Sequence, residues 1–196
     1  MIGSLRGRIS AKAPPQLTVE VGGVGYELEA PMSTFFQLPP VGAEVHLLTH
    51  LVVREDAHVL FGFGSEEERR LFRSLIKVSG VGPKIALALL SGISVADFHQ
   101  HVQSQDIGAL TRVPGIGRKT AERLIVEMRD RLTAPELAAD APGGALAGSP
   151  ETEAYAALVA LGYRPAEATR LLKGAGPGTQ STEELIRRAL QGAVRE

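Results

Sequence analysis

Two short glycine-rich segments, each followed by a lysine, occur thirty-five residues apart in this chain of 196 residues. The first is SGVGPK and the second PGIGRK, and an apolar helical pattern precedes and follows each of them. Each copy is therefore predicted to form a helix, a glycine hairpin and a second helix. The corresponding positions are Leu75 and Leu110, Val78 and Val113, Gly80 and Gly115, Val81 and Ile116, Gly82 and Gly117, Lys84 and Lys119, Ala86 and Ala121, and Leu89 and Leu124.

These hairpins have the chemistry of an anion site. Glycines permit unusual φ angles and close approach of a ligand, and the start of the following helix adds unpaired N–H donors and partial positive charge. A single such segment is an ordinary turn, but duplication with matching lysines suits consecutive phosphates of a nucleic-acid strand, which carry no base identity. The predicted DNA-binding residues are Ser79, Gly80, Val81, Gly82, Lys84, Pro114, Gly115, Ile116, Gly117, Arg118, Lys119, Thr120 and Arg123.

Other glycine-rich sites do not fit the spacing. A P-loop needs Gly-x-x-x-x-Gly-Lys-Ser/Thr, whereas Arg118 precedes Lys119 here. The Gly22–Gly25 segment has Leu28 where a dinucleotide-binding motif needs glycine. No nucleotide site, catalytic constellation, metal site or cofactor is predicted, so any ATPase activity is expected on another chain.

The chain is 44% hydrophobic, has no cysteine, and has no apolar run of membrane-spanning length, which predicts a cytoplasmic protein without disulfides. Its formal net charge of −1 conceals an uneven distribution. Residues 1–65 carry four basic and six acidic side chains, residues 66–132 carry eleven and eight, and residues 133–196 carry six and eight. Positive charge is concentrated around the hairpins, as a nucleic-acid binder requires.

The predicted fold class is α+β with several domains. Residues 1–64 contain five short apolar runs separated by turn residues, which favours a small OB-type β-barrel. Residues 65–132 form an all-α domain with the tandem hairpins, in which Ser65 and either Ser94 or Asp97 begin helices. The predicted strands are Ile2–Ile9, Leu17–Val21, Val24–Glu29, Glu44–Val53 and His58–Phe63, with a tight turn at Gly22–Gly23.

Residues 133–150 are rich in Ala, Pro, Gly and Ser and are predicted to form a flexible linker. Residues 151–196 then form three short helices, Glu151–Leu161, Pro165–Lys173 and Ser181–Gln191, with a Leu161-Gly162-Tyr163 turn typical of UBA-like modules. A module this small is near the limit of independent stability, so its exposed apolar residues favour a partner protein. The predicted partner-binding residues are Leu158, Leu161, Gly162 and Tyr163.

The order of these parts, and nearly the whole chain outside the linker, resembles the RuvA family of Holliday-junction-binding proteins. The phrases that carry the resemblance are MIGSLRGRI, VEVGGVGYE, THLVVREDAHVLFGF, LIKVSGVGPKIALALLSG, VPGIGRKTAERLIVEM and ALVALGYRPAEA. It implies a non-catalytic DNA-binding subunit that holds a four-way junction open and square as a homotetramer. It further implies a hexameric ATPase motor, RuvB, tethered by the last module, and names a junction-resolving nuclease, RuvC, as a candidate partner.

The resemblance also changes the interpretation of one turn. By residue type alone, Glu55 and Asp56 are solvated turn residues, but in this family the turn is an acidic pin whose copies meet where the strands exchange. Gathered carboxylates would repel phosphates and favour an open crossover. The role of Arg54, and the choice between one tetramer and two, stay open. So do a helix-hairpin-helix subunit of a repair nuclease and, less compatible with the paired lysines, a protein scaffold without DNA.

Overall fold

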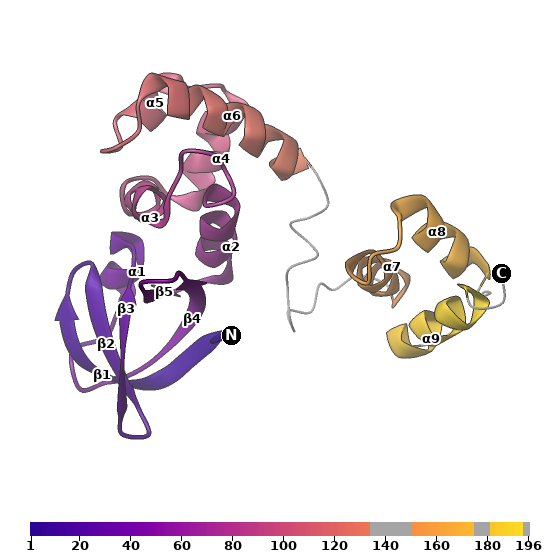
Figure 1. Ribbon diagram of the computed structural model, residues 1–196, viewed down its shortest axis with the longest axis horizontal. Coiled ribbons are helices and arrows are strands. Elements are labelled where there is room, and N and C mark those ends of the chain that lie inside the picture. Colours follow the sequence, from indigo (N-terminus) through magenta and orange to yellow (C-terminus); the bar gives the residue numbers. More distant parts are fainter. Residues whose placement is uncertain (134–149, 175–180, 194–196) are drawn as a thin grey trace. The chain divides into compact units, whose positions relative to one another are not determined.

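A closed five-stranded barrel begins the chain in the computed structural model, which describes residues 1–133, 150–174 and 181–193 (Figure 1). Its strand order, β1-β2-β3-β5-β4, is that of the OB-type barrel that the sequence predicts, and only β3 and β5 pair in parallel. The last three strands have their predicted bounds, whereas β1 continues through an irregular register between Ile9 and Ala11. The strands are β1 (Ser4–Ala13), β2 (Gln16–Val21), β3 (Val24–Glu29), β4 (Glu44–Val53) and β5 (His58–Phe63).

The turns of the barrel follow from residue type, with one element that the sequence did not predict. Gly22 and Gly23 have φ angles of 59° and 84°, which makes the tight β2–β3 turn possible. The unpredicted element is the six-residue helix α1 (Met32–Gln37), which has Pro31 at its start and no side-chain cap. It buries Phe35 and leaves Phe36 79% exposed.

Five helices follow the barrel and contain both hairpins: α2 (Glu66–Leu75), α3 (Pro83–Gly92), α4 (Val95–Gln103), α5 (Ile107–Thr111) and α6 (Arg118–Thr133). Side-chain caps explain where three of them begin. The Ser65 hydroxyl accepts from the Glu68 amide, Ser94 from the Asp97 amide, and the Asp106 carboxylate from the Ala109 amide. Ser94 is therefore the N-cap of α4, which decides between Ser94 and Asp97, the two helix starts that the sequence left open.

Strand β5 is buried on both faces because it packs against the barrel interior and against the helices. Leu60 belongs to the barrel core, whereas Phe61 and Phe63 each lie with their ring centroids 4.9 Å from that of Phe72 on α2. Between them, a Cβ on Gly62 would lie 3.1 Å from Leu28 Cδ2, so the barrel interior has little room for a side chain there. The barrel and the helices, expected as separate domains 1–64 and 65–132, thus share a core.

Buried polar contacts reinforce this joint. The Thr34 hydroxyl donates to the Glu68 carboxylate at 2.8 Å and accepts from the Gly64 amide at 3.0 Å, which ties α1 to the start of α2. The guanidinium of the buried Arg69 donates to the Gly3 carbonyl at 2.8 Å, which ties α2 to the residue just before β1. Residues 1–133 accordingly form one compact unit.

The described residues of the second unit form three helices, α7 (Pro150–Ala160), α8 (Pro165–Gly174) and α9 (Thr182–Ala193), close to the predicted ranges. Leu158, Ala168 and Ala189 form its buried centre. Helix α7 ends in a Schellman motif, in which Gly162 has a φ of 98° and the Tyr163 amide donates to the Leu158 carbonyl. The predicted linker, residues 133–150, lies almost entirely outside the described residues.

Among the described residues, no individual helix has both the length and the apolarity needed to cross a membrane. Helices α3 and α4 meet that criterion only when taken together, and they are bent by 99°.

Burial lowers the pKa of His50, at the joint between β4 and α2, below its ordinary 6.5, and the charges of Arg73 and Arg69 lower it further. The folded state therefore keeps His50 neutral while the unfolded chain takes up a proton, so stability is lost as pH falls from about 6.5 towards the folded pKa. Between pH 7.5 and 5.5, the urea midpoint should fall more for the parent than for His50→Gln. Equal falls in the two proteins would contradict this assignment, since the other histidines are common to both.

Candidate nucleic-acid interface

The two hairpins have the same backbone conformation, as their repeated sequence predicts. Gly80 and Gly115 have φ angles of 89° and 88°, a region that side chains with a Cβ rarely adopt. The hydrogen bonds also repeat at corresponding positions. In the first hairpin, residues 78–84, the Val81 amide donates to the Val78 carbonyl at 3.0 Å, and in the second, residues 113–119, Ile116 donates to Val113 at 3.1 Å.

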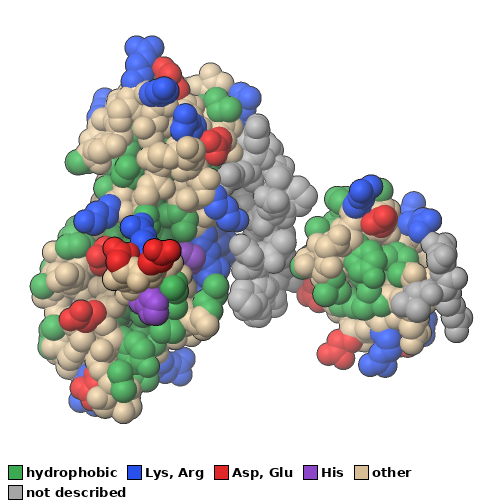
Figure 2. All heavy atoms as spheres, in the orientation of Figure 1, with side chains coloured by type: hydrophobic (Ala, Val, Ile, Leu, Met, Phe, Trp, Pro, Cys, Tyr) green, Lys and Arg blue, Asp and Glu red, His purple; other side chains and the backbone are tan. Residues whose placement is uncertain are grey.

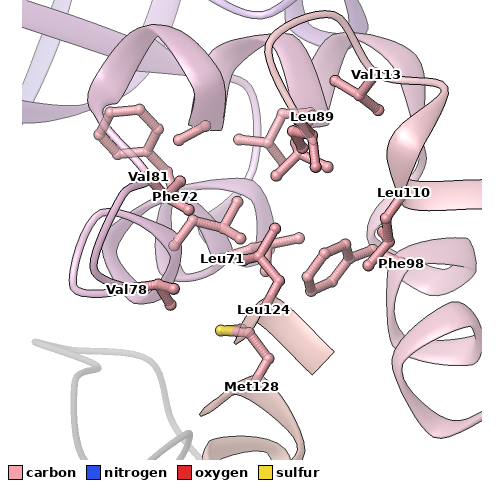
Figure 3. Packing of buried hydrophobic residues seen from close by; sticks show 14 of the residues in the cluster. Leu71, Phe72, Val78, Val81, Leu89, Phe98, Leu110, Val113, Leu124 and Met128 are labelled. Carbon is pink, nitrogen blue, oxygen red and sulfur yellow. The ribbon is translucent and has the colours of Figure 1, made fainter. Parts of the chain in front are cut away.

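The central apolar residue of each hairpin faces the core. Val81 and Ile116 are 4% and 5% exposed, and Figure 3 shows Val81 among buried side chains of the helices. Their amides are already donated within the hairpin. Val81 and Ile116 therefore anchor each hairpin from inside and leave its glycines at the surface, and the expectation that these two residues also contact DNA stays a prediction.

The outward backbone donors lie where each hairpin meets its second helix. Among the described residues, the amides of Gly82 and Lys84 have no hydrogen-bond acceptor, and neither do those of Gly117 and Lys119. These are the unpaired first-turn donors of α3 and α6, and they make an anion site with the positive end of the helix dipole. The backbone donors of the two copies differ at one position of the first turn, because Pro83 has no N–H where Arg118 has one.

Exposed cations surround these amides. Lys84, Lys119 and Arg118 are all exposed, and Figure 2 shows Lys and Arg side chains at the end of the helical region where Figure 1 places α5 and α6. The Arg118 guanidinium donates to the Glu122 carboxylate at 3.0 Å, so this carboxylate competes with any phosphate for Arg118. Of the other predicted residues, Ser79 and Pro114 are exposed, whereas Thr120 is half-buried.

An open groove of about 590 Å³ adjoins the second hairpin, and sequence reasoning did not predict it. Gly108, which lines it, stands where the first copy has Arg73. Aligning the two copies at their glycines would have revealed this difference. The groove is lined by Ile107, Gly108, Thr111, Ile116, Gly117 and Arg118.

Arg123 has an intramolecular partner that its position on α6 did not predict. Its Nη1 donates at 2.9 Å to the carbonyl of Ser79, forty-four residues earlier, at the start of the first hairpin. A Cβ on Gly80 would lie 3.9 Å from the same nitrogen, and a Cβ on Gly115 would lie 3.7 Å from Ile85 Cγ1. Each glycine turn thus lies against the second helix of the other copy.

The predicted acidic pin is the tip of the β4–β5 hairpin. Val53 pairs with His58, and the Arg54 amide donates to the Ala57 carbonyl at 2.9 Å, which leaves Glu55 and Asp56 as the two residues at the tip. All six residues from 53 to 58 are exposed. The acids therefore project into solvent from the rigid strand pair that ends in the shared core.

The predicted partner-binding residues divide into a core and a surface set. Leu158 is fully buried, so it stabilises the module and cannot present its side chain to a partner, a correction to the sequence-based expectation. Leu161 is 61% exposed at the end of α7, beside Gly162 and the half-buried Tyr163. Figure 2 shows hydrophobic side chains gathered on the visible face of this unit.

Comparison with known proteins finds three matching family models. They are the RuvA N terminal domain over residues 1–62, the SAM-like helix-hairpin-helix tandem over residues 72–130, and the RuvA C-terminal domain over residues 149–193. Relatives named "Holliday junction branch migration complex subunit RuvA" come from Methylococcus capsulatus, at 59% identity, and Thioalkalivibrio sulfidiphilus, at 54%. Each alignment covers 100% of this chain and 100% of the relative. With its barrel, tandem hairpins and terminal helical module all matched, the chain belongs to the RuvA family.

Proposed function

We propose that this protein binds four-way DNA junctions by shape and holds them open for branch migration driven by a separate ATPase motor. The duplicated hairpin carries the proposal, because it presents outward amides and a lysine twice at a fixed separation. Such contacts bind phosphates without reading bases. The printed name of the relatives, a subunit of a Holliday junction branch migration complex, supports the same function. The chain itself then acts as a DNA-binding scaffold without catalytic residues.

The proposed assembly is a homotetramer, in which each protomer supplies two hairpins to a duplex arm and one acidic pin to the crossover. Four copies of Glu55 and Asp56 near one point repel phosphates and disfavour continuous duplex through the centre. Attraction along the arms and repulsion at the middle together select a junction over linear DNA. The exposed position of both acids at a hairpin tip supports this role.

The C-terminal unit is proposed to bind the hexameric motor, RuvB, through the exposed end of α7. Leu161 is a large apolar side chain that the module does not bury, and Tyr163, two residues further on, adds a half-buried ring. Exposed apolar side chains of this kind are typical of protein-binding surfaces. Binding DNA with residues 1–133 and the motor with the terminal unit would allow the two functions to be separated by mutation.

Lys84 and Lys119 should contribute equally to the binding affinity for junctions of every base sequence. Changing Lys84 and Lys119 to Gln should lower junction affinity at least about tenfold at low salt, and should flatten the plot of log affinity against log salt, because fewer counterions are released. Filter binding or anisotropy at four salt concentrations measures both. The control replaces Arg8 and Lys173, which are exposed on β1 and α8, with Gln. An unchanged slope in the hairpin variant would remove these lysines from the interface.

The pin should decide selectivity between DNA shapes. Glu55→Gln with Asp56→Asn should raise affinity for linear duplex several-fold more than for the junction. The reason is that the pins would no longer repel the phosphates of a duplex that runs through the centre of the tetramer. Competition between the two DNAs at one salt concentration measures the ratio. Glu20→Gln with Glu27→Gln removes the same charge from exposed sites on β2 and β3. If the pin variant discriminates as well as the parent, Glu55 and Asp56 are only solvated turn residues.

Leu161→Ser should weaken motor binding about tenfold or more without affecting junction affinity, because an exposed side chain contributes little to the fold. Calorimetry with the isolated motor and a junction-binding assay measure the two effects. Val126→Ser, at another exposed apolar position, 58% exposed on α6, is the matched control. Normal motor binding by Leu161→Ser would place the motor contact elsewhere.

A further inference from the structure

A directional contact connects the first hairpin to the helix that follows the second. Arg123, on the helix that follows the second hairpin, donates through Nη1 to the Ser79 carbonyl at the entry to the first. The corresponding position in the first copy is Ala88, which has no donor to return the contact. The other contact between the copies described above, Ile85 with the turn at Gly115, is apolar and not directional.

This contact acts on a segment whose position matters. Ser79 immediately precedes Gly80, whose positive φ directs the chain back into α3 and sets where the Gly82 and Lys84 amides point. The hydrogen bond from the Val81 amide fixes the turn internally, but it does not fix the turn relative to the second hairpin. A charged donor on the rigid helix α6 does fix it, since a guanidinium–carbonyl bond is directional.

We propose that Arg123 is a positioning residue that holds the first hairpin at the separation from the second that consecutive backbone phosphates require. This inference rests on the proposed function and adds the device that sets the spacing of its two anion sites. Precise spacing matters because two linked sites bind one strand together only when their separation matches the strand. The guanidinium has five donors, so the bond to Ser79 leaves others for solvent or DNA.

The experiment compares Arg123→Gln and Arg123→Lys with Lys119→Gln, which removes a neighbouring charge on the same helix without touching Ser79. Hydrogen exchange is measured over residues 78–82 in the DNA-free protein, and junction affinity is measured across a salt series. Circular dichroism melting shows whether each variant stays folded at the assay temperature. Exchange in the free protein does not depend on DNA binding, so it tests the contact separately from the proposed function.

Arg123→Gln should speed exchange over residues 78–82 and lower junction affinity roughly three- to tenfold, as expected for one charge-assisted hydrogen bond. Arg123→Lys, which keeps a donor and the charge, should recover part of both, whereas Lys119→Gln should flatten the salt slope and leave exchange unchanged. Unchanged exchange in Arg123→Gln overturns the positioning role. Faster exchange with parental affinity also overturns it, because the spacing would then not matter. If Arg123→Gln and Lys119→Gln both bind like the parent, the proposed interface itself fails.

Discussion

The interface depends on a packing constraint inside each hairpin. A turn this short can direct its amides outward only if its central side chain is fixed in the core, and Val81 and Ile116 meet this requirement in the two copies. Burial of these side chains contributes roughly 1.5–3 kcal/mol each. The glycines on either side then lie at the surface, where a phosphate can approach the backbone. Each short hairpin therefore contributes to folding through its buried central side chain and to binding through the exposed backbone of its glycines.

Much of the fold could be predicted because its signals are local. Three strands have their predicted bounds, and Ser65 caps α2 as its sequence context indicates. Helix α1 was missed because it is short, has no side-chain cap and begins after Pro31, so neither periodicity nor capping marks it. The β1 extension was missed because it depends on pairing with β2 across an irregular register.

The site was predicted less completely, for a related reason. The glycine and lysine positions follow from the repeat, but burial of Val81 and of Leu158 depends on which face of the backbone meets the core. The bond from Arg123 to Ser79 joins residues far apart in the chain, and no periodic pattern encodes it. Likewise, the pairing of Arg118 with Glu122 reduces the local positive charge that a residue count assigns to the second hairpin.

The alternation of side chains along β5 fixes the register of this strand. It runs from the acidic tip to the rings that pack on Phe72, and its side chains alternate between the barrel interior and the helices. Inserting or deleting one residue would turn Phe61 and Phe63 towards the crowded barrel interior, whereas a change of two would preserve the alternation. A slip of β5 by one residue against β4 would therefore cost the packing of both rings on α2, whereas the turn at residues 54–57 can change in length without moving them.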